Sequence, residues 1–262
     1  MEFHVIYRIS DKGHNADKLK LPNATKTHCL QNAIEHFGRE RFHVIADNCS
    51  PELVSFIESE GLDFEETHLG NSPAFKYAVN YAVRTYSPDD IVYLLEDDYL
   101  HLPDSRKLII EGLEFADYVT LYDHSNLYKT GNLRLRGAFP LNRFGLHRWR
   151  IYVTASSHWR ENPTTTMTFA AKVKTLSEDS KIFMENPDKG VPDDFVTFLK
   201  LTKQRSPFDA FRAIPYMKPA MTILLNNFAL FRKKRLLVSC IPGRATHCET
   251  KWLSPLTDWT KI

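Results

Sequence analysis

Short apolar runs alternate with helical stretches at a regular spacing through the first part of the chain, and this alternation constrains the fold more than any other feature. Four strands are expected, at Phe3–Ile9, Phe42–Ala46, Asp63–His68 and Ile91–Leu95. Three helices are expected between them, at Ala24–Phe37, Pro51–Glu60 and Ser72–Tyr86. Repeated strand–helix–strand units form parallel sheets with right-handed crossovers, and such sheets bind ligands at the carboxyl ends of their strands. Candidate functional residues should therefore lie just after each strand.

The alternation weakens after the fourth predicted strand. A helix at Ser105–Phe115 and a strand at Tyr118–Tyr122 continue it, whereas Asn126–Arg160 lacks long helical periodicity, so hairpin strands or an ordered loop are expected there. The remaining expected elements are a strand, two helices, and a late strand with a loop, at Thr165–Ala171, Val173–Phe183, Asp193–Leu201 and Leu236–Ile262. No repeat or linker divides the sequence, which predicts a single α/β domain over residues 1–262.

The composition is that of a folded protein without a general affinity for nucleic acid. Lys and Arg number 34 against 32 Asp and Glu, and the formal net charge of +2 is too balanced for broad binding to nucleic acid or membrane surfaces. No apolar run is long enough for a membrane span, and the first residues lack the pattern of a signal peptide, so a cytoplasmic location is expected. The four cysteines have no CxxC spacing, which favours reduced thiols.

Three consecutive carboxylates, Glu96, Asp97 and Asp98, directly follow the apolar run Ile91–Leu95. They should lie at the end of a buried strand, where like charges repel unless a cation relieves them. Mg²⁺ and Mn²⁺ prefer carboxylate oxygens and leave coordination positions for phosphate. The segment therefore indicates a metal and phosphate site, and removal of Asp98 should leave the melting temperature unchanged or raise it. The structural alternative is an acidic turn that caps the next helix.

This turn resembles the DxD-type signature of nucleotide-sugar glycosyltransferases with the GT-A fold, in a Glu-x-Asp variant. The resemblance covers most of the chain and is strongest in its first half. Polar residues follow the first three strands where that family contacts its donor: Arg8 and Ser10, Asp47, and Asn71 in a Gly-Asn-Ser turn. Each also has an ordinary explanation, as a strand-end charge, an Asx turn or a helix cap. Their occurrence at one sheet edge favours a shared pocket.

The resemblance implies a fold and a reaction. The fold would be a mostly parallel, Rossmann-like α/β sheet flanked by helices, with a small antiparallel region on the acceptor side. Residues 1–125 would bind the nucleotide sugar and residues 126–262 the acceptor. A nucleotide-diphosphate sugar, most often a UDP sugar, would donate a hexosyl or deoxyhexosyl group to a glycan or another hydroxyl acceptor. The residues expected to contact this donor are Arg8, Ser10, Asp47, Asn71, Glu96 and Asp97.

Catalytic and metal-binding residues also follow from the resemblance. Asp193 and Asp194 open a helix, where one aspartate suffices as a cap. Inverting members place such a pair beneath the acceptor, so Asp194 is the expected general base and Asp193 the cap or its reserve. Many metal-dependent members bring a late histidine to the ion, so Asp98 and His247 are the expected Mn²⁺ or Mg²⁺ ligands. A zinc site of His247 and Cys248 is the alternative, weakened by the absence of a second ligand pair.

Two groups of basic residues are open to more than one interpretation. The segment Asn126–Arg160 could bind diphosphate or an acceptor sugar, or it could form a solvated surface. The side chains concerned are Arg143, Arg148, Arg150 and Arg160, with Trp149, His158 and Trp159. The run Arg232–Arg235 is a weak indication of proximity to an anionic membrane, since such runs are usually solvated charge.

Three other enzyme activities and one non-catalytic function fit parts of the pattern. A retaining glycosyltransferase would share the fold. A sugar nucleotidyltransferase would need a glycine-rich basic loop after the first strand, where Arg8–Gly13 has one glycine. A metal phosphohydrolase would more naturally place an acid after that strand, where Arg8 stands. A saccharide-binding module without activity would not need an intact acidic turn, acidic pair and histidine.

Overall fold

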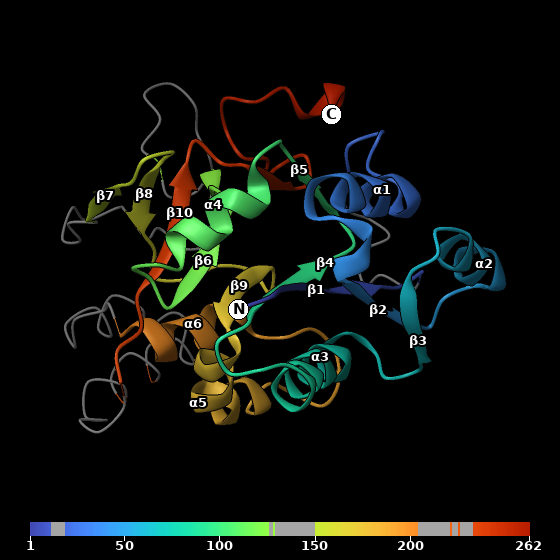
Figure 1. Ribbon diagram of the computed structural model, residues 1–262, viewed down its shortest axis with the longest axis horizontal. Helices are drawn as coiled ribbons and strands as arrows, with labels where there is room; N and C mark the ends of the chain where they lie inside the picture. Colours follow the sequence, from blue (N-terminus) through green and yellow to red (C-terminus); the bar gives the residue numbers. More distant parts are fainter. Residues whose placement is uncertain (12–18, 126–127, 129–149, 204–220, 222–224, 226–232) are drawn as a thin grey trace.

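The computed structural model describes residues 1–11, 19–125, 128, 150–203, 221, 225 and 233–262 (Figure 1). At its centre is a nine-stranded sheet with the strand order β3-β2-β1-β4-β9-β6-β10-β8-β7. A second sheet, of two short antiparallel strands, pairs β5 with β11. The α/β fold with a mostly parallel sheet and a small antiparallel region is thus confirmed.

The first part of the chain has the predicted alternation. Four parallel strands form one side of the large sheet: β1 (Phe3–Ile9), β2 (Phe42–Asp47), β3 (Asp63–Thr67) and β4 (Ile91–Glu96). The connecting helices are α1 (Lys26–Phe37), α2 (Pro51–Ser59) and α3 (Asn71–Thr85). Side-chain oxygens of Thr25 and Ser50 accept hydrogen bonds from the free N–H groups of α1 and α2, which fixes where these helices begin.

The second part completes the sheet in mixed orientation. Its strands are β6 (Tyr118–Thr120), β7 (Ile151–Val153), β8 (His158–Glu161), β9 (Phe169–Lys172) and β10 (Leu237–Ile241). Pairing between neighbours shows that only β9 and β8 run against the other strands of the sheet. The antiparallel β7–β8 pair confirms the hairpin expected before Arg160. The helices of this part are α4 (Ser105–Gly112), α5 (Val173–Met184) and α6 (Asp194–Thr202).

Two expectations about strands are corrected. The strand predicted at Thr165–Ala171 begins at Phe169, which pairs with Leu94; beyond this pair the N–H of Glu96 donates to the Thr168 hydroxyl at 3.1 Å and not to a backbone carbonyl, so the ladder ends there. Strand β5 (Tyr99–His101) was not expected and pairs antiparallel with β11 (Ala245–His247). Both strands are too short for an alternating pattern to be visible in the sequence.

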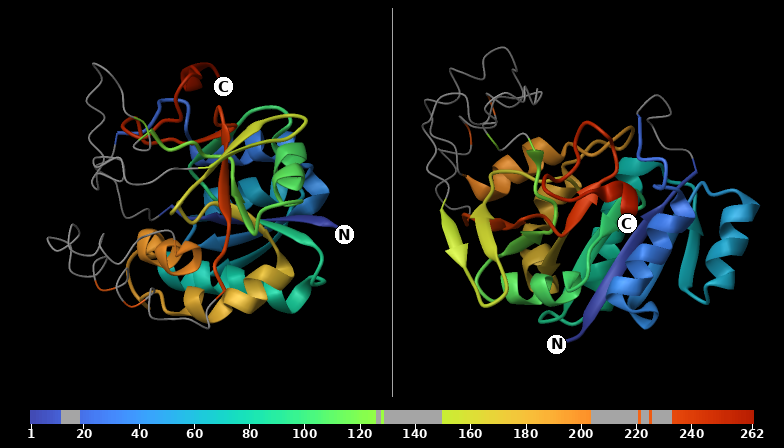
Figure 2. Two further views of the ribbon diagram at one scale, coloured as in Figure 1. Left: turned by 90° about the vertical axis from the view of Figure 1, so that its left-hand side faces the viewer. Right: turned by 90° about the horizontal axis from the view of Figure 1, so that it is seen from above.

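Helices cover both faces of the sheet (Figure 2). One buried cluster joins the sheet to α1, α2 and α4, and a second joins the opposite face to α3, α5 and α6. Strand β4 supplies Tyr93 and Leu95 to the first cluster and Val92 and Leu94 to the second. Because β4 is buried on both faces, its sequence is a continuous apolar run. This packing fixes the position of the acidic turn that follows it.

Other expectations can be compared with the described residues. No helix among them is both long and apolar enough to cross a membrane. All four cysteines are free thiols, as expected. The run Arg232–Arg235 is not uniform: Arg232 lies outside the described residues, Lys233 and Lys234 are exposed, and Arg235 is only 2% exposed, so Arg235 is not a surface charge.

Arg235 is buried because it is paired. Its guanidinium donates to Asp179 Oδ2 at 2.7 Å, to Glu178 Oε2 at 2.7 Å and to Asp117 Oδ1 at 3.1 Å. Asp179 also accepts a hydrogen bond from the Tyr118 hydroxyl at 2.7 Å. Arg235 therefore ties the start of β10 to α5 and β6 and faces the protein interior.

We expect Arg235→Met to lower the free energy of unfolding at pH 7 by about 3 kcal/mol or more, because the variant leaves a buried carboxylate at Asp179 without its cation. Urea denaturation measures this loss. The matched control is Lys233→Met, whose side chain is 64% exposed and which should change the free energy by less than about 0.5 kcal/mol. Equal effects of the two substitutions would contradict the structural role of Arg235.

Candidate active site

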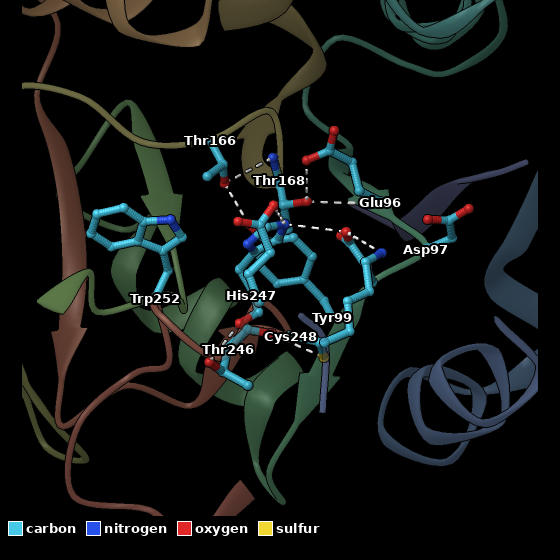
Figure 3. Close-up of polar contacts among 12 residues, drawn as sticks. Glu96, Asp97, Tyr99, Thr166, Thr168, Thr246, His247, Cys248 and Trp252 are labelled. Atoms are coloured by element: carbon cyan, nitrogen blue, oxygen red, sulfur yellow. Dashed lines mark hydrogen bonds and ion pairs between the residues drawn. The ribbon is translucent and has the colours of Figure 1, made fainter. Parts of the chain in front are cut away.

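The acidic turn lies at the sheet edge where the parallel strands end. Glu96 is the last residue of β4, and Asp97 and Asp98 form the turn that leads into β5. Arg8 of β1 is the register partner of Glu96. Figure 3 shows the Thr168 hydroxyl beside the Glu96 carboxylate, with His247 nearby and Asp97 set apart from them. Segments from the beginning, middle and end of the chain thus meet here.

Arg8 joins the ends of β1 and β4 to the start of α3. Its guanidinium donates to Glu96 Oε1 at 3.0 Å and to Asn71 Oδ1 at 3.2 Å. It also lies over the ring of Phe75, 5.3 Å from the ring centre. Glu96 accepts a further hydrogen bond from the Thr168 hydroxyl at 3.3 Å. Three residues predicted to contact the donor, Arg8, Asn71 and Glu96, are therefore brought together.

Asp97 is bound by the segment that follows β1. One carboxylate oxygen accepts a hydrogen bond from the backbone N–H of Ser10 at 2.8 Å. The other lies 2.5 Å from the ammonium nitrogen of Lys26, in the first turn of α1. Asp97 thereby connects the acidic turn to the β1–α1 connection.

Asp98 contacts two basic side chains through one oxygen. Its Oδ2 lies 3.0 Å from Lys20 Nζ and 3.2 Å from His247 Nε2. Burial alone would raise the pKa of Asp98, but His247 and Lys20 hold it well below its usual range. Burial alone would lower the pKa of His247, but Asp98, together with Glu249 and Glu96, more than offsets this and raises it. The two residues predicted to share a metal ion are thus in direct contact.

The repulsion expected within the acidic turn is relieved by the chain itself. Each of the three carboxylates has a cationic partner: Arg8 for Glu96, Lys26 for Asp97, and Lys20 with His247 for Asp98. The sequence interpretation missed Lys20 and Lys26. Their position after the first strand was the available signal, because that connection begins at the same sheet edge as the acidic turn.

The Asp98–His247 pair fits part of the coordination shell of a divalent ion. Its 3.2 Å separation is close to the roughly 3 Å between neighbouring ligands of an octahedral ion with bonds of about 2.1 Å. Within the described ranges, no group of three or more His, Cys, Asp or Glu side chains is arranged to hold a metal. Water and phosphate usually supply the remaining ligands of Mg²⁺. Asp98 and His247 would therefore supply two ligands of such an ion and leave its other positions to water or phosphate.

The zinc alternative is not supported by the state of Cys248. A hydrogen bond with Cys29 and burial raise the pKa of the Cys248 thiol far above its usual range. Zinc would need this thiol as a thiolate and would have to displace its hydrogen bond with Cys29.

The carboxylate of Asp47 accepts hydrogen bonds from other residues of the protein. Its carboxylate is 4% exposed and accepts hydrogen bonds from the Thr67 hydroxyl at 2.9 Å and the backbone N–H groups of Leu69 and Gly70 at 2.6 and 2.9 Å. In the structure Asp47 therefore fixes the loop between β3 and α3, directly before Asn71. Any contribution to donor binding would come through the position of that loop.

The two aspartates at the start of α6 have different environments. Asp193 Oδ1 accepts a hydrogen bond from the backbone N–H of Val196 at 3.1 Å, which confirms Asp193 as the N-cap. Asp194 is the first residue of the helix and is half-buried. Burial, with smaller contributions from Glu96 and Asp193, raises the pKa of Asp194 to about 7, against the opposing effects of a hydrogen bond from the N–H of Phe195 and of His247. Asp194 thus responds to the charges of the acidic turn.

The basic residues of the irregular middle are only partly described. Arg160 is 5% exposed and donates to Asp123 Oδ1 at 2.6 Å, and Trp159 is fully buried, so neither the ligand-binding nor the solvated interpretation holds for them. Asp123, which follows β6, was not identified from the sequence. Arg150 and His158 are exposed. The other residues of this group lie outside the described residues: Arg143, Arg148 and Trp149.

Comparison with known proteins gives weak similarities of fold. No family model and no curated protein matches the sequence. The structural neighbours are GT-A-type nucleotide-sugar glycosyltransferases and related nucleotidyltransferases. One is TarS 1-349 of S. aureus, with a TM-score of 0.41, 17% identity, and coverage of 76% of this chain and 56% of that one. The chain thus spans little more than half of that structure.

Two further neighbours represent these two kinds of enzyme. GalNAc-T7, crystallised with UDP, GalNAc and Mn²⁺, has a TM-score of 0.48 and 10% identity, over 94% of this chain and 43% of that one. A CMP:2-keto-3-deoxy-manno-octonic acid synthetase in complex with CTP has a TM-score of 0.45 and 11% identity, over 93% of this chain and 92% of that one.

The pairing of Asp98 reverses the expected effect of its removal on stability. We expect Asp98→Ala to lower the free energy of unfolding at pH 7 by about 1–3 kcal/mol, because Lys20 and His247 lose a charged hydrogen-bond partner. Since the folded-state pKa of Asp98 is depressed, its contribution is full above an unfolded pKa of about 3.9 and is lost as the pH falls below that value. Urea denaturation at pH 7 and below pH 4 measures both effects.

The control for this substitution is Asp188→Ala. Asp188 also pairs with a lysine, but its side chain is 93% exposed, so its removal should leave the free energy of unfolding nearly unchanged. A melting temperature of Asp98→Ala at or above that of the wild type would show that repulsion within the turn outweighs its ion pairs.

Proposed function

We propose that the protein is a glycosyltransferase that moves a sugar from a nucleotide-diphosphate sugar to a hydroxyl acceptor. One observation carries the proposal: Asp98 and His247, from distant segments, are in contact at the carboxyl edge of the parallel sheet, and Asp194 is near enough for Glu96 and His247 to affect its pKa. In open α/β sheets this edge is where ligands bind. The Asp98–His247 pair is suited to a phosphate-bound cation. Asp194 adds a carboxyl group whose pKa lies near neutrality.

The donor half of the proposed site is built on the β1, β3 and β4 ends. Arg8, Ser10 and Asn71 would lie on the nucleoside side, and Glu96 and Asp97 would shape the space between nucleoside and sugar. Asp98 and His247 would hold Mn²⁺ or Mg²⁺, which would neutralise the charge on the departing nucleoside diphosphate. UDP is the proposed nucleotide because the family that the sequence resembles uses it most often.

Asp194 is the proposed general base. Its carboxylate would take the proton of an acceptor hydroxyl while that oxygen forms a bond to the anomeric carbon. The bond from the anomeric carbon to the diphosphate breaks on the opposite side, so the anomeric configuration inverts. A base with a pKa of about 7 is well matched to this work at neutral pH. Asp193 would keep the helix start in place as its N-cap.

A nucleotidyltransferase is the second candidate, and one observation favours it. Lys20 and Lys26 follow β1 and reach the acidic turn, at the place where such enzymes bind a triphosphate through basic residues. The position of Asp194 favours sugar transfer, which needs a base beside the acceptor. The two reactions differ in their products: sugar transfer releases a nucleoside diphosphate, and nucleotidyl transfer releases pyrophosphate.

A product assay tests the proposed function. We expect the protein to release UDP from at least one UDP sugar when Mn²⁺ and a panel of saccharides are supplied, and Asp98→Ala to abolish the release. Chromatography of the nucleotides measures it. Release of pyrophosphate from UTP and sugar 1-phosphates, without release of UDP from UDP sugars, would support the second candidate and contradict the first.

The role of Asp194 is tested by substitution. We expect Asp194→Asn to reduce transfer about 10²–10⁴-fold while leaving UDP affinity near that of the wild type, because a general base contributes on that order to the rate. Below pH 7 the wild-type rate should fall tenfold per pH unit as Asp194 becomes protonated, with a midpoint near 7. This dependence should be missing from the residual activity of the variant.

The matched control is Asp193→Asn. Asparagine is about as good an N-cap as aspartate, so this variant should keep its stability and most of its transfer rate. If Asp193→Asn loses transfer and Asp194→Asn does not, the base is Asp193. Normal transfer by both variants would exclude base catalysis from this helix and favour a retaining mechanism.

A further inference from the structure

Lys20 occupies the place where an incoming cation would bind. Its ammonium nitrogen lies 3.0 Å from Asp98 Oδ2, and His247 Nε2 approaches the same oxygen at 3.2 Å. An ion held by Asp98 and His247 would need this oxygen, and it would repel a neighbouring ammonium group. Ion binding by this pair therefore requires that Lys20 move away.

The position of Lys20 is set by the backbone. Residues 19–21 run antiparallel to residues 248–250, with a bridge between Lys20 and Glu249. The N–H of Leu21 donates to the carbonyl of Cys248 at 3.0 Å, and the N–H of Thr250 donates to the carbonyl of Leu19 at 2.9 Å. Lys20 is thus anchored to the segment that follows His247. Its ammonium group can change partners while its backbone stays in place.

We propose that Lys20 couples ion binding to diphosphate binding. In the empty site it neutralises Asp98; when an ion takes Asp98, the ammonium group passes to the diphosphate that accompanies the ion. The inference rests on the proposed function. Lysine suits this exchange because its ammonium is a point charge on a flexible stem and binds phosphate readily. A diphosphate gives Lys20 a new anionic partner, so each ligand should favour the binding of the other.

Lys26 provides a matched comparison. It carries the same charge and contacts the same acidic turn, but its partner is Asp97 Oδ1, 2.5 Å away. A general effect of positive charge near the site should appear when either lysine is removed. The replacement of an ammonium group by an ion at Asp98 should depend on Lys20 alone.

The test measures the affinity for Mn²⁺ with and without saturating UDP, by electron paramagnetic resonance of free Mn²⁺. The proteins are the wild type, Lys20→Met, Lys26→Met and Lys20→Arg. Without UDP, we expect Lys20→Met to bind Mn²⁺ about tenfold more tightly than the wild type, because no charged hydrogen bond has to be displaced. UDP should tighten Mn²⁺ binding in the wild type by about tenfold more than it does in Lys20→Met. Lys26→Met and Lys20→Arg should retain the wild-type coupling.

The outcomes separate this inference from the proposed function. Equal coupling in the wild type and Lys20→Met, or an equal loss of coupling in Lys26→Met, would overturn the inference and leave the proposed function standing. A wild-type protein that binds no UDP in the presence of Mn²⁺ would overturn both. Retained coupling in Lys20→Arg shows that the loss in Lys20→Met comes from the charge and not from misfolding.

Discussion

Three carboxylates at the end of β4 repel one another, and the rest of the site is arranged so that each of them has a cation beside it. Arg8 comes from β1, Lys26 from α1, and Lys20 with His247 from two segments that are paired through their backbones. These ion pairs hold the beginning and the end of the chain against its central strand. The electrostatic cost of the acidic turn thus determines which segments form the candidate active site.

The same charge balance relates the structure to the proposed chemistry. A site whose cations belong to the chain can hold its acidic turn in place before any ligand arrives. A donor that brings a dication and a diphosphate supplies one new partner for Asp98 and one for the ammonium group of Lys20. Asp194 lies close enough for Glu96 and His247 to affect its pKa. The charges of the acidic turn therefore influence the fraction of Asp194 that is deprotonated and can act as the proposed base.

The sequence predicts most of the fold and part of the site, for physical reasons. Alternating periodicities identify β1 to β4, and burial on both faces makes β4 a continuous apolar run. The contact between Asp98 and His247 was predicted through a family resemblance. Strands β5 and β11, which create it, are too short to show a pattern. Lys20 and Arg235 look like surface charges until the fold brings Asp98 and Asp179 beside them. Such partners are distant in sequence and leave no local signal.

The most direct test of the central claim is the binding of UDP and Mn²⁺ to the wild type and to Asp98→Asn, measured by thermal unfolding and titration calorimetry. The account predicts that UDP with Mn²⁺ stabilises the wild type, by about 2.7 kcal/mol at 100 times the dissociation constant, and that Asp98→Asn loses this stabilisation while remaining folded. UDP binding of equal strength in both proteins would contradict it. So would the absence of stabilisation of the wild type by any nucleoside diphosphate in the presence of Mn²⁺ or Mg²⁺.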